Sequence, residues 1–125
     1  MLRVAGWLIV TSCLVLQGFA ETAETLGKAE ELYKHTEYEA SLALLDQHSF
    51  NSPTNFLIGR NYFMMGDFKK ASEFFQKAAS GNPTNSEYMD WLGRAYGKRA
   101  ETSNPLSAPG YASKARQAFE KAVEL

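Results

Sequence analysis

NFLIGRNYFMMGDFKKASEFFQKAASGNPTN, which spans Asn55–Asn85, is the stretch that decides the fold of this 125-residue chain. Apolar and small residues recur in it at helical spacing on both sides of Gly66, which predicts two helices joined by a tight turn. Gly59 and Ala71 are small enough for the two helices to cross closely, and aromatic side chains fill the space between the helices. Pro83 then ends the second helix, because proline cannot continue it.

The stretch resembles a tetratricopeptide repeat, a helix-turn-helix unit of about 34 residues. The resemblance rests on eight positions at the spacing of that family: Ile58, Gly59, Tyr62, Phe68, Ala71, Phe75, Ala78 and Pro83. It implies an all-α, right-handed α-solenoid in which helical hairpins stack side by side. It also implies a protein interaction module, whose first helices line a concave groove that binds peptides.

The same pattern occurs on both sides of this repeat. Upstream, five positions lie 30 residues before their counterparts: Ala29, Leu32, Tyr38, Ser41 and Leu45 precede Gly59, Tyr62, Phe68, Ala71 and Phe75. Downstream, Leu92, Gly93 and Tyr96 follow their counterparts by 34 residues, whereas Ala115, Phe119 and Ala122 follow theirs by 44. The third hairpin therefore holds ten extra residues (44 − 34), which we expect to lengthen both of its helices.

These offsets predict repeats at about residues 22–51, 52–85 and 86–125 in a domain of residues 21–125. We expect helices at 21–34, 38–48, 53–65 and 68–80, and then two long helices separated by a loop at 102–107. Gly81 is expected to supply a left-handed cap. The positions expected to pack the repeats are Ala29, Gly59, Tyr62, Ala71, Phe75, Ala78, Pro83, Gly93, Tyr96, Ala115, Phe119 and Ala122.

The last predicted helix, residues 108–125, has no further helix after it in the sequence to cover it. We expect it to expose in part a stripe that includes Tyr111, Ala115, Phe119 and Ala122. Either this face binds a partner, for which a second copy of the chain is the simplest choice, or the sequence is the front end of a longer array.

The first 20 residues predict a signal peptide. Arg3 gives a positive start, Val4–Leu16 is almost wholly apolar, and Gly18 and Ala20 provide the small residues that a signal peptidase reads. Cleavage after Ala20 would export the chain to the periplasm or the outside, so that the whole resembles small exported bacterial members of the family. An uncleaved membrane anchor is one alternative.

Cys13 offers a second alternative, because Val10-Thr11-Ser12-Cys13 resembles the box before a lipidated cysteine. Cutting there would split the apolar run, so a cysteine that serves as a small hydrophobe in the signal peptide is favoured. The mature chain would contain no cysteine, and its stability would depend on packing without disulfides.

Composition and motifs argue against nucleic-acid binding and catalysis. The chain has 13 Lys and Arg against 14 Asp and Glu, and loss of Arg3 gives 12 − 14 = −2, without the basic surplus that phosphate binding needs. His35 and His48 lie in no metal-ligand spacing, and no nucleophile elbow or phosphate-binding loop is present. We therefore expect no enzyme activity, cofactor or metal.

The resemblance assigns groove positions to ten residues: Glu30, Tyr33, Lys34, Phe56, Arg60, Phe63, Met64, Asp90, Arg94 and Lys98. Arg60 and Arg94 are equivalent in consecutive repeats, and either hold a partner's carboxylate together or pair with Glu30 and Asp90. Phe56, Phe63 and Met64 are either exposed anchors or core filling. The expected function is a non-catalytic protein–protein interaction module or scaffold of the cell envelope, with an oligomerising assembly subunit as the alternative.

Overall fold

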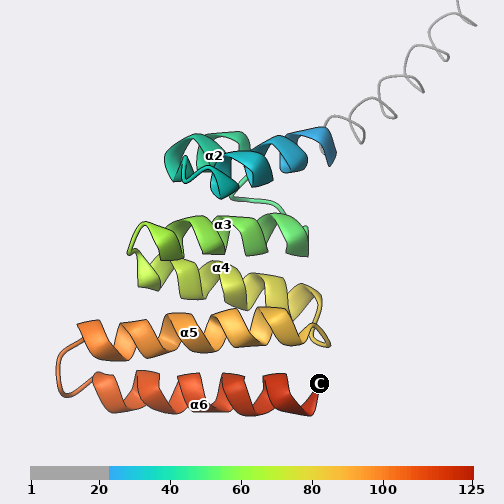
Figure 1. Ribbon diagram of the computed structural model, residues 1–125. Helices are drawn as coiled ribbons and strands as arrows, with labels where there is room; N and C mark the ends of the chain where they lie inside the picture. Colours follow the sequence, from blue (N-terminus) through green and yellow to red (C-terminus); the bar gives the residue numbers. More distant parts are fainter. Residues whose placement is uncertain (1–22) are drawn as a thin grey trace, which may run out of the picture.

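The computed structural model describes residues 23–125, so the predicted signal peptide lies outside the described part. Residues 23–34 form the first helix in that part, and it is followed by five more: α2 (Tyr38–Leu44), α3 (Ser52–Met64), α4 (Phe68–Gly81), α5 (Ser86–Thr102) and α6 (Ala108–Glu124). No strand occurs in these residues. The helices stack in chain order as three hairpins (Figure 1), which confirms the predicted all-α solenoid.

Side-chain caps fix where three of the helices begin. Asn51 Oδ1 accepts the N–H of Thr54 before α3, at 3.0 Å. Asp67 Oδ1 accepts the backbone N–H of Lys70 before α4, and Asn85 Oδ1 accepts that of Tyr88 before α5. Such caps satisfy N–H groups that the first helical turn leaves without partners.

The same contact, a phenylalanine ring on a glycine, occurs in the second and third hairpins. The ring of buried Phe75 in α4 lies over Gly59 in α3, where a Cβ atom would come within 2.6 Å of it. Phe119 in α6 lies over Gly93 in α5 in the same way, at 2.7 Å. The two glycines are 34 residues apart and the two phenylalanines 44, so the predicted offsets connect residues that make the same contact.

The first hairpin meets α3 through a buried polar chain in addition to apolar contacts. Asn61 Nδ2 donates to Ser41 Oγ at 2.9 Å, and Ser41 Oγ donates to the carbonyl of Ala29 at 2.8 Å. Asn61 and Ser41 are both fully buried. Ser41 occupies the position that Ala71 holds in the next hairpin, so this polar connection is specific to the first one.

The ten extra residues lie where the offsets predicted. Helices α5 and α6 have 17 residues each, against 13 in α3 and 14 in α4. Only residues 103–107 form the loop between the two long helices. The α5–α6 hairpin consequently reaches beyond the turn between α3 and α4, as Figure 1 shows.

Two predicted helix ends are wrong. The second helix was expected to reach His48 but ends at Leu44, because Asp46 accepts the N–H of His48 and forms a turn instead. Gly81 is not a left-handed cap but the last residue of α4, where a Cβ atom would clash with Ser52 Oγ. Gly66 is the described glycine with a positive φ, at 83°.

The apolar stripe of α6 packs inward more than predicted. Ala115 is buried, and Tyr111 and Ala122 are half-buried, because this side of α6 faces α5. Phe119 alone in the stripe stays exposed, at 39%. The most exposed apolar side chain on α6 is instead that of Val123, at 88%.

No helix among the described residues has the length and apolar character that a membrane crossing requires.

Candidate protein-binding surfaces

Arg60 connects the first two hairpins on the face formed by residues 23–34, α3 and α5, which we call the first-helix face. Its Nη2 donates to Glu30 Oε2 at 2.7 Å. Its guanidinium also lies 4.7 Å from the ring centroids of Tyr33 and Phe56, so that it is held between two aromatic rings. Only 16% of its side chain is exposed. Arg60 therefore acts mainly as a fixed connection between repeats.

Arg94 is the more accessible arginine of this face. It pairs with Asp90 at 2.8 Å along α5, and 53% of its side chain remains exposed. The guanidinium lies 5.1 Å from the ring centroid of Trp91, which in turn contacts Phe63 edge-on at 5.4 Å. Of the two predicted alternatives for the arginines, the structure thus has the one in which each pairs with its own acid.

The other predicted groove residues divide between core and surface. Phe56 is buried against Phe75 and Tyr88, so it fills the core and is not an exposed anchor. Phe63 is half-buried and Met64 is exposed. Lys34 and Lys98 are exposed, and each pairs with an acid on its own helix, Glu31 and Glu101, at 3.0 Å.

Burial also affects two tyrosines of this region. Burial raises the pKa of Tyr33 above its ordinary value, with the Arg60 cation opposing the shift and Tyr38 and Glu30 adding to it. The pKa of Tyr88 is likewise raised, by burial first and by the neighbouring Glu87 carboxylate. Both hydroxyls therefore stay protonated at neutral pH.

Trp91 is the residue of this face that sequence reasoning missed. It makes ring contacts with Phe56, Phe63 and Phe75, and it supports Arg94. A usable signal existed, because Trp91 lies 34 residues after Leu57, a fully buried position of the second repeat. The larger indole at that position in the third repeat is half-buried, so part of it lies at the surface.

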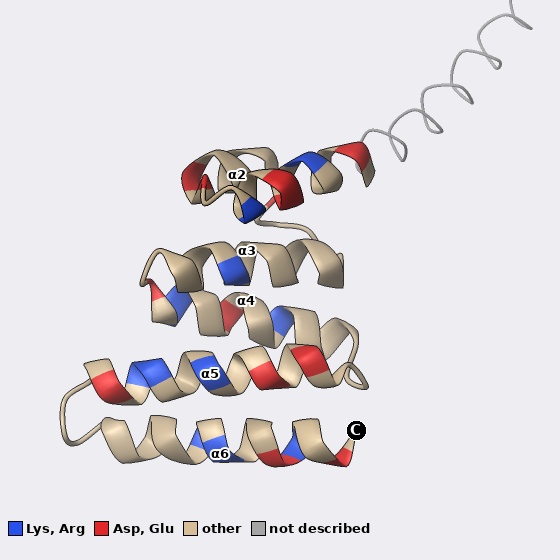
Figure 2. Ribbon diagram, viewed as in Figure 1, with Lys and Arg blue, Asp and Glu red and all other residues tan. Residues whose placement is uncertain are grey.

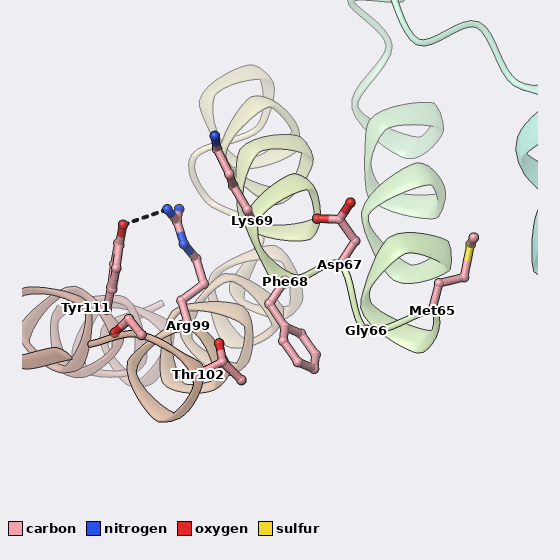
Figure 3. A pocket seen from close by; sticks show the side chains of 9 residues that line it. Met65, Gly66, Asp67, Phe68, Lys69, Arg99, Thr102 and Tyr111 are labelled. Atoms are coloured by element: carbon pink, nitrogen blue, oxygen red, sulfur yellow. Dashed lines mark hydrogen bonds between the residues drawn. The ribbon is translucent and has the colours of Figure 1, made fainter. Parts of the chain in front are cut away.

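A second surface is the hollow that we call the hairpin recess, with a volume of about 570 Å³. It lies between the α3–α4 turn, the end of α5 and the start of α6 (Figure 3). Arg99 donates from Nη2 to the Tyr111 hydroxyl at 2.8 Å and from Nη1 to Ser72 Oγ at 2.9 Å. Its guanidinium lies 4.2 Å from the Tyr111 ring centroid.

The described residues offer little for metal binding. His35 and His48 are exposed, and residues 23–125 contain no group of three or more metal-ligating side chains. Both signs of charge occur on α4, α5 and α6 (Figure 2). What the two surfaces can offer a ligand is therefore aromatic contact, apolar contact and arginine hydrogen bonds.

Comparison with known families agrees with this geometry. Residues 52–85 match the family model described as tetratricopeptide repeat, and this range coincides with the second predicted repeat. Neither the curated proteins nor the solved structures yield a significant match. Repeats of this family are typically non-catalytic and mediate protein–protein interactions. The chain therefore contains a tetratricopeptide repeat at residues 52–85, at the centre of its stack of helical hairpins.

Proposed function

We propose that the chain is a non-catalytic scaffold that binds a peptide segment of a partner protein on its first-helix face. The observation that carries this proposal is the exposed guanidinium of Arg94 on Trp91, whose ring contacts Phe63, with Met64 exposed on the preceding repeat. Arginine and large aromatic residues supply most of the binding energy at protein interfaces. The ion pair with Asp90 leaves guanidinium N–H groups for a partner's carbonyl or carboxylate oxygens.

A crosslinking experiment tests this function in the native compartment. A photoreactive amino acid at Met64 should capture a discrete partner, and purified partner should then bind the full chain. Arg94→Glu should weaken that binding by about tenfold or more, because it removes a charge-assisted contact. Arg116→Glu is the matched control, since Arg116 also pairs with an acid four residues away, Glu120, but on α6. Equal binding by the two variants would contradict the proposal.

We further propose that this binding takes place outside the cytoplasm, in the periplasm or the surrounding medium. The support is the sequence of residues 1–20, with its positive start, apolar run and small residues before the expected cleavage point. N-terminal sequencing of chain recovered from the envelope fraction should begin at Glu21. A chain that keeps Met1 in the cytoplasmic fraction would exclude export.

A second candidate function is an assembly subunit that pairs with its own copy through α6. The observation in its favour is that Phe119 and Val123 are exposed one turn apart on this helix. Apolar side chains at such a spacing form a stripe that a second helix can cover.

A further inference from the structure

The hairpin recess exists because the third hairpin is longer than the second. The last turn of α5 and the first turn of α6 extend past the α3–α4 turn. The hollow of about 570 Å³ lies between these two helix ends and that turn. This surface is separate from the first-helix face, since none of the residues that line it belongs to the proposed peptide-binding set. Any ligand it takes is therefore a second one, or a second part of the same partner.

Arg99 is the one arginine of the described residues without a carboxylate partner. Arg60, Arg94 and Arg116 lie 2.7, 2.8 and 3.7 Å from an acid, whereas Arg99 has hydrogen bonds only to the hydroxyls of Ser72 and Tyr111. Two neutral hydroxyls and the Tyr111 ring fix the guanidinium without neutralising it. A cation held in this way has lost its rotamer freedom before a ligand arrives, which favours binding.

The charge around Arg99 remains uncompensated within the recess. Lys69, on the α4 side, has no acid within 4.0 Å in the described part of the chain. The recess has one acid, Asp67, and it already accepts the backbone N–H of Lys70 and lies 4.0 Å from Lys70 Nζ. In Figure 3, Arg99 and Lys69 extend to the same side of the turn. The recess thus offers two cations to one anionic group.

The geometry points to a carboxylate of an acidic peptide as the ligand of the hairpin recess, bound by Arg99 and Lys69. A guanidinium presents parallel N–H donors that match a carboxylate, and the lysine adds a point charge. Exposed Met65 and half-buried Phe68 offer apolar contact to a neighbouring side chain of the same peptide. The carboxylate belongs either to an Asp or Glu side chain or to the peptide's C-terminus, and these two sources share the same chemistry.

Nuclear magnetic resonance of the full chain, labelled with ¹⁵N, tests the site directly. The probes are a short peptide rich in Asp and Leu with an amidated C-terminus, the same peptide with Asn for Asp, and that Asn peptide with a free C-terminus. The Asp peptide should shift the Arg99 Nε–H and Gly66 N–H signals at about 1 mM, and the amidated Asn peptide should not. A shift by the free Asn peptide alone would assign the site to C-terminal carboxylates.

Two variants separate binding from folding. Thr102→Glu places a carboxylate at an exposed edge of the recess without removing any hydrogen bond of Arg99. It should therefore weaken binding of the Asp peptide by about tenfold. Gln117→Glu adds the same charge on the exposed surface of α6 outside the recess and should leave binding unchanged. Arg94→Glu should also leave it unchanged, which distinguishes this site from the first-helix face. Equal shifts by all three peptides, no shift at all, or equal weakening by Thr102→Glu and Gln117→Glu would overturn the inference.

Discussion

At the scale of single residues, the stack depends on aromatic rings that lie directly on glycines. Phe75 covers Gly59, and Phe119 covers Gly93, although the second pair is separated by ten more residues of chain. A glycine in the middle of a helix costs up to about 1 kcal/mol relative to alanine. These two are retained at that cost because a methyl group would occupy the space of the ring.

Substituting alanine for three glycines should give three different results. Gly59→Ala should destabilise the fold by about 1–3 kcal/mol, because Phe75 is fully buried and cannot move aside. Gly93→Ala should cost less, since the partly exposed Phe119 can shift outward. Gly97→Ala should stabilise by up to about 1 kcal/mol, because no atom lies within 4 Å of its Cβ position. Urea unfolding measures all three, and a Gly59→Ala variant as stable as Gly97→Ala would contradict the ring contact.

The repeat pattern could predict these packing glycines, but it could not decide the state of Phe56 or Arg60. Spacing within one repeat shows which side chains face the partner helix of the same hairpin. Phe56 is buried because Tyr88 and Trp91 from the next hairpin cover it. Arg60 is held by Glu30 and Tyr33 from the preceding one. Such contacts depend on how neighbouring hairpins lie against each other, which a local pattern does not contain.

At the scale of elements, the helices were predictable where a repeat offset supports them and less so at their ends. The ten-residue insertion, the two long helices and their short loop follow from the offsets of 34 and 44 residues. The end of α2 was missed because Leu44 and Leu45 continue a helical apolar pattern, whereas Asp46 starts a turn. Side-chain capping of a turn competed with that pattern and prevailed.

Helix α2 should be the least stable helix of those from α2 to α6. It has seven residues, buries only Ser41 fully, and its N-cap residue, Glu37, makes no side-chain cap, whereas α4 buries six residues over two more turns. Hydrogen exchange followed by mass spectrometry should show that 38–44 exchanges first and that α4 exchanges late.

A cap substitution provides the control for this prediction. Glu37→Asp should supply the missing cap, stabilise α2 by about 1 kcal/mol and slow its exchange, while α6 remains unaffected. Protection of α2 equal to that of α4 in the unaltered chain would show that the first hairpin is held by more than the contacts described.

At the scale of the whole molecule, the outer surface of the last hairpin differs from the equivalent surface of the second hairpin, which the last hairpin covers. On α6, the ion pair Arg116–Glu120 occupies the positions that Ser72 and Gln76 hold in α4. Ser72, the counterpart of Arg116, is buried there. The apolar side chains that remain on α6, Phe119 and Val123, are therefore bordered by charge, which limits the partners that can cover them.

Association of two copies through α6 should be weak and should depend on Val123. In a two-fold dimer one substitution removes the same contact twice, and burying a valine side chain contributes about 1.5–3 kcal/mol. Light scattering of the full chain should show a mass that rises with concentration, and Val123→Lys should keep the mass at that of the monomer. Ala112→Lys, another exposed position near the start of α6, serves as the control and should not change the association. If the unaltered chain stays monomeric at all concentrations, α6 does not pair with its copy, and the first-helix face and hairpin recess remain as its binding surfaces.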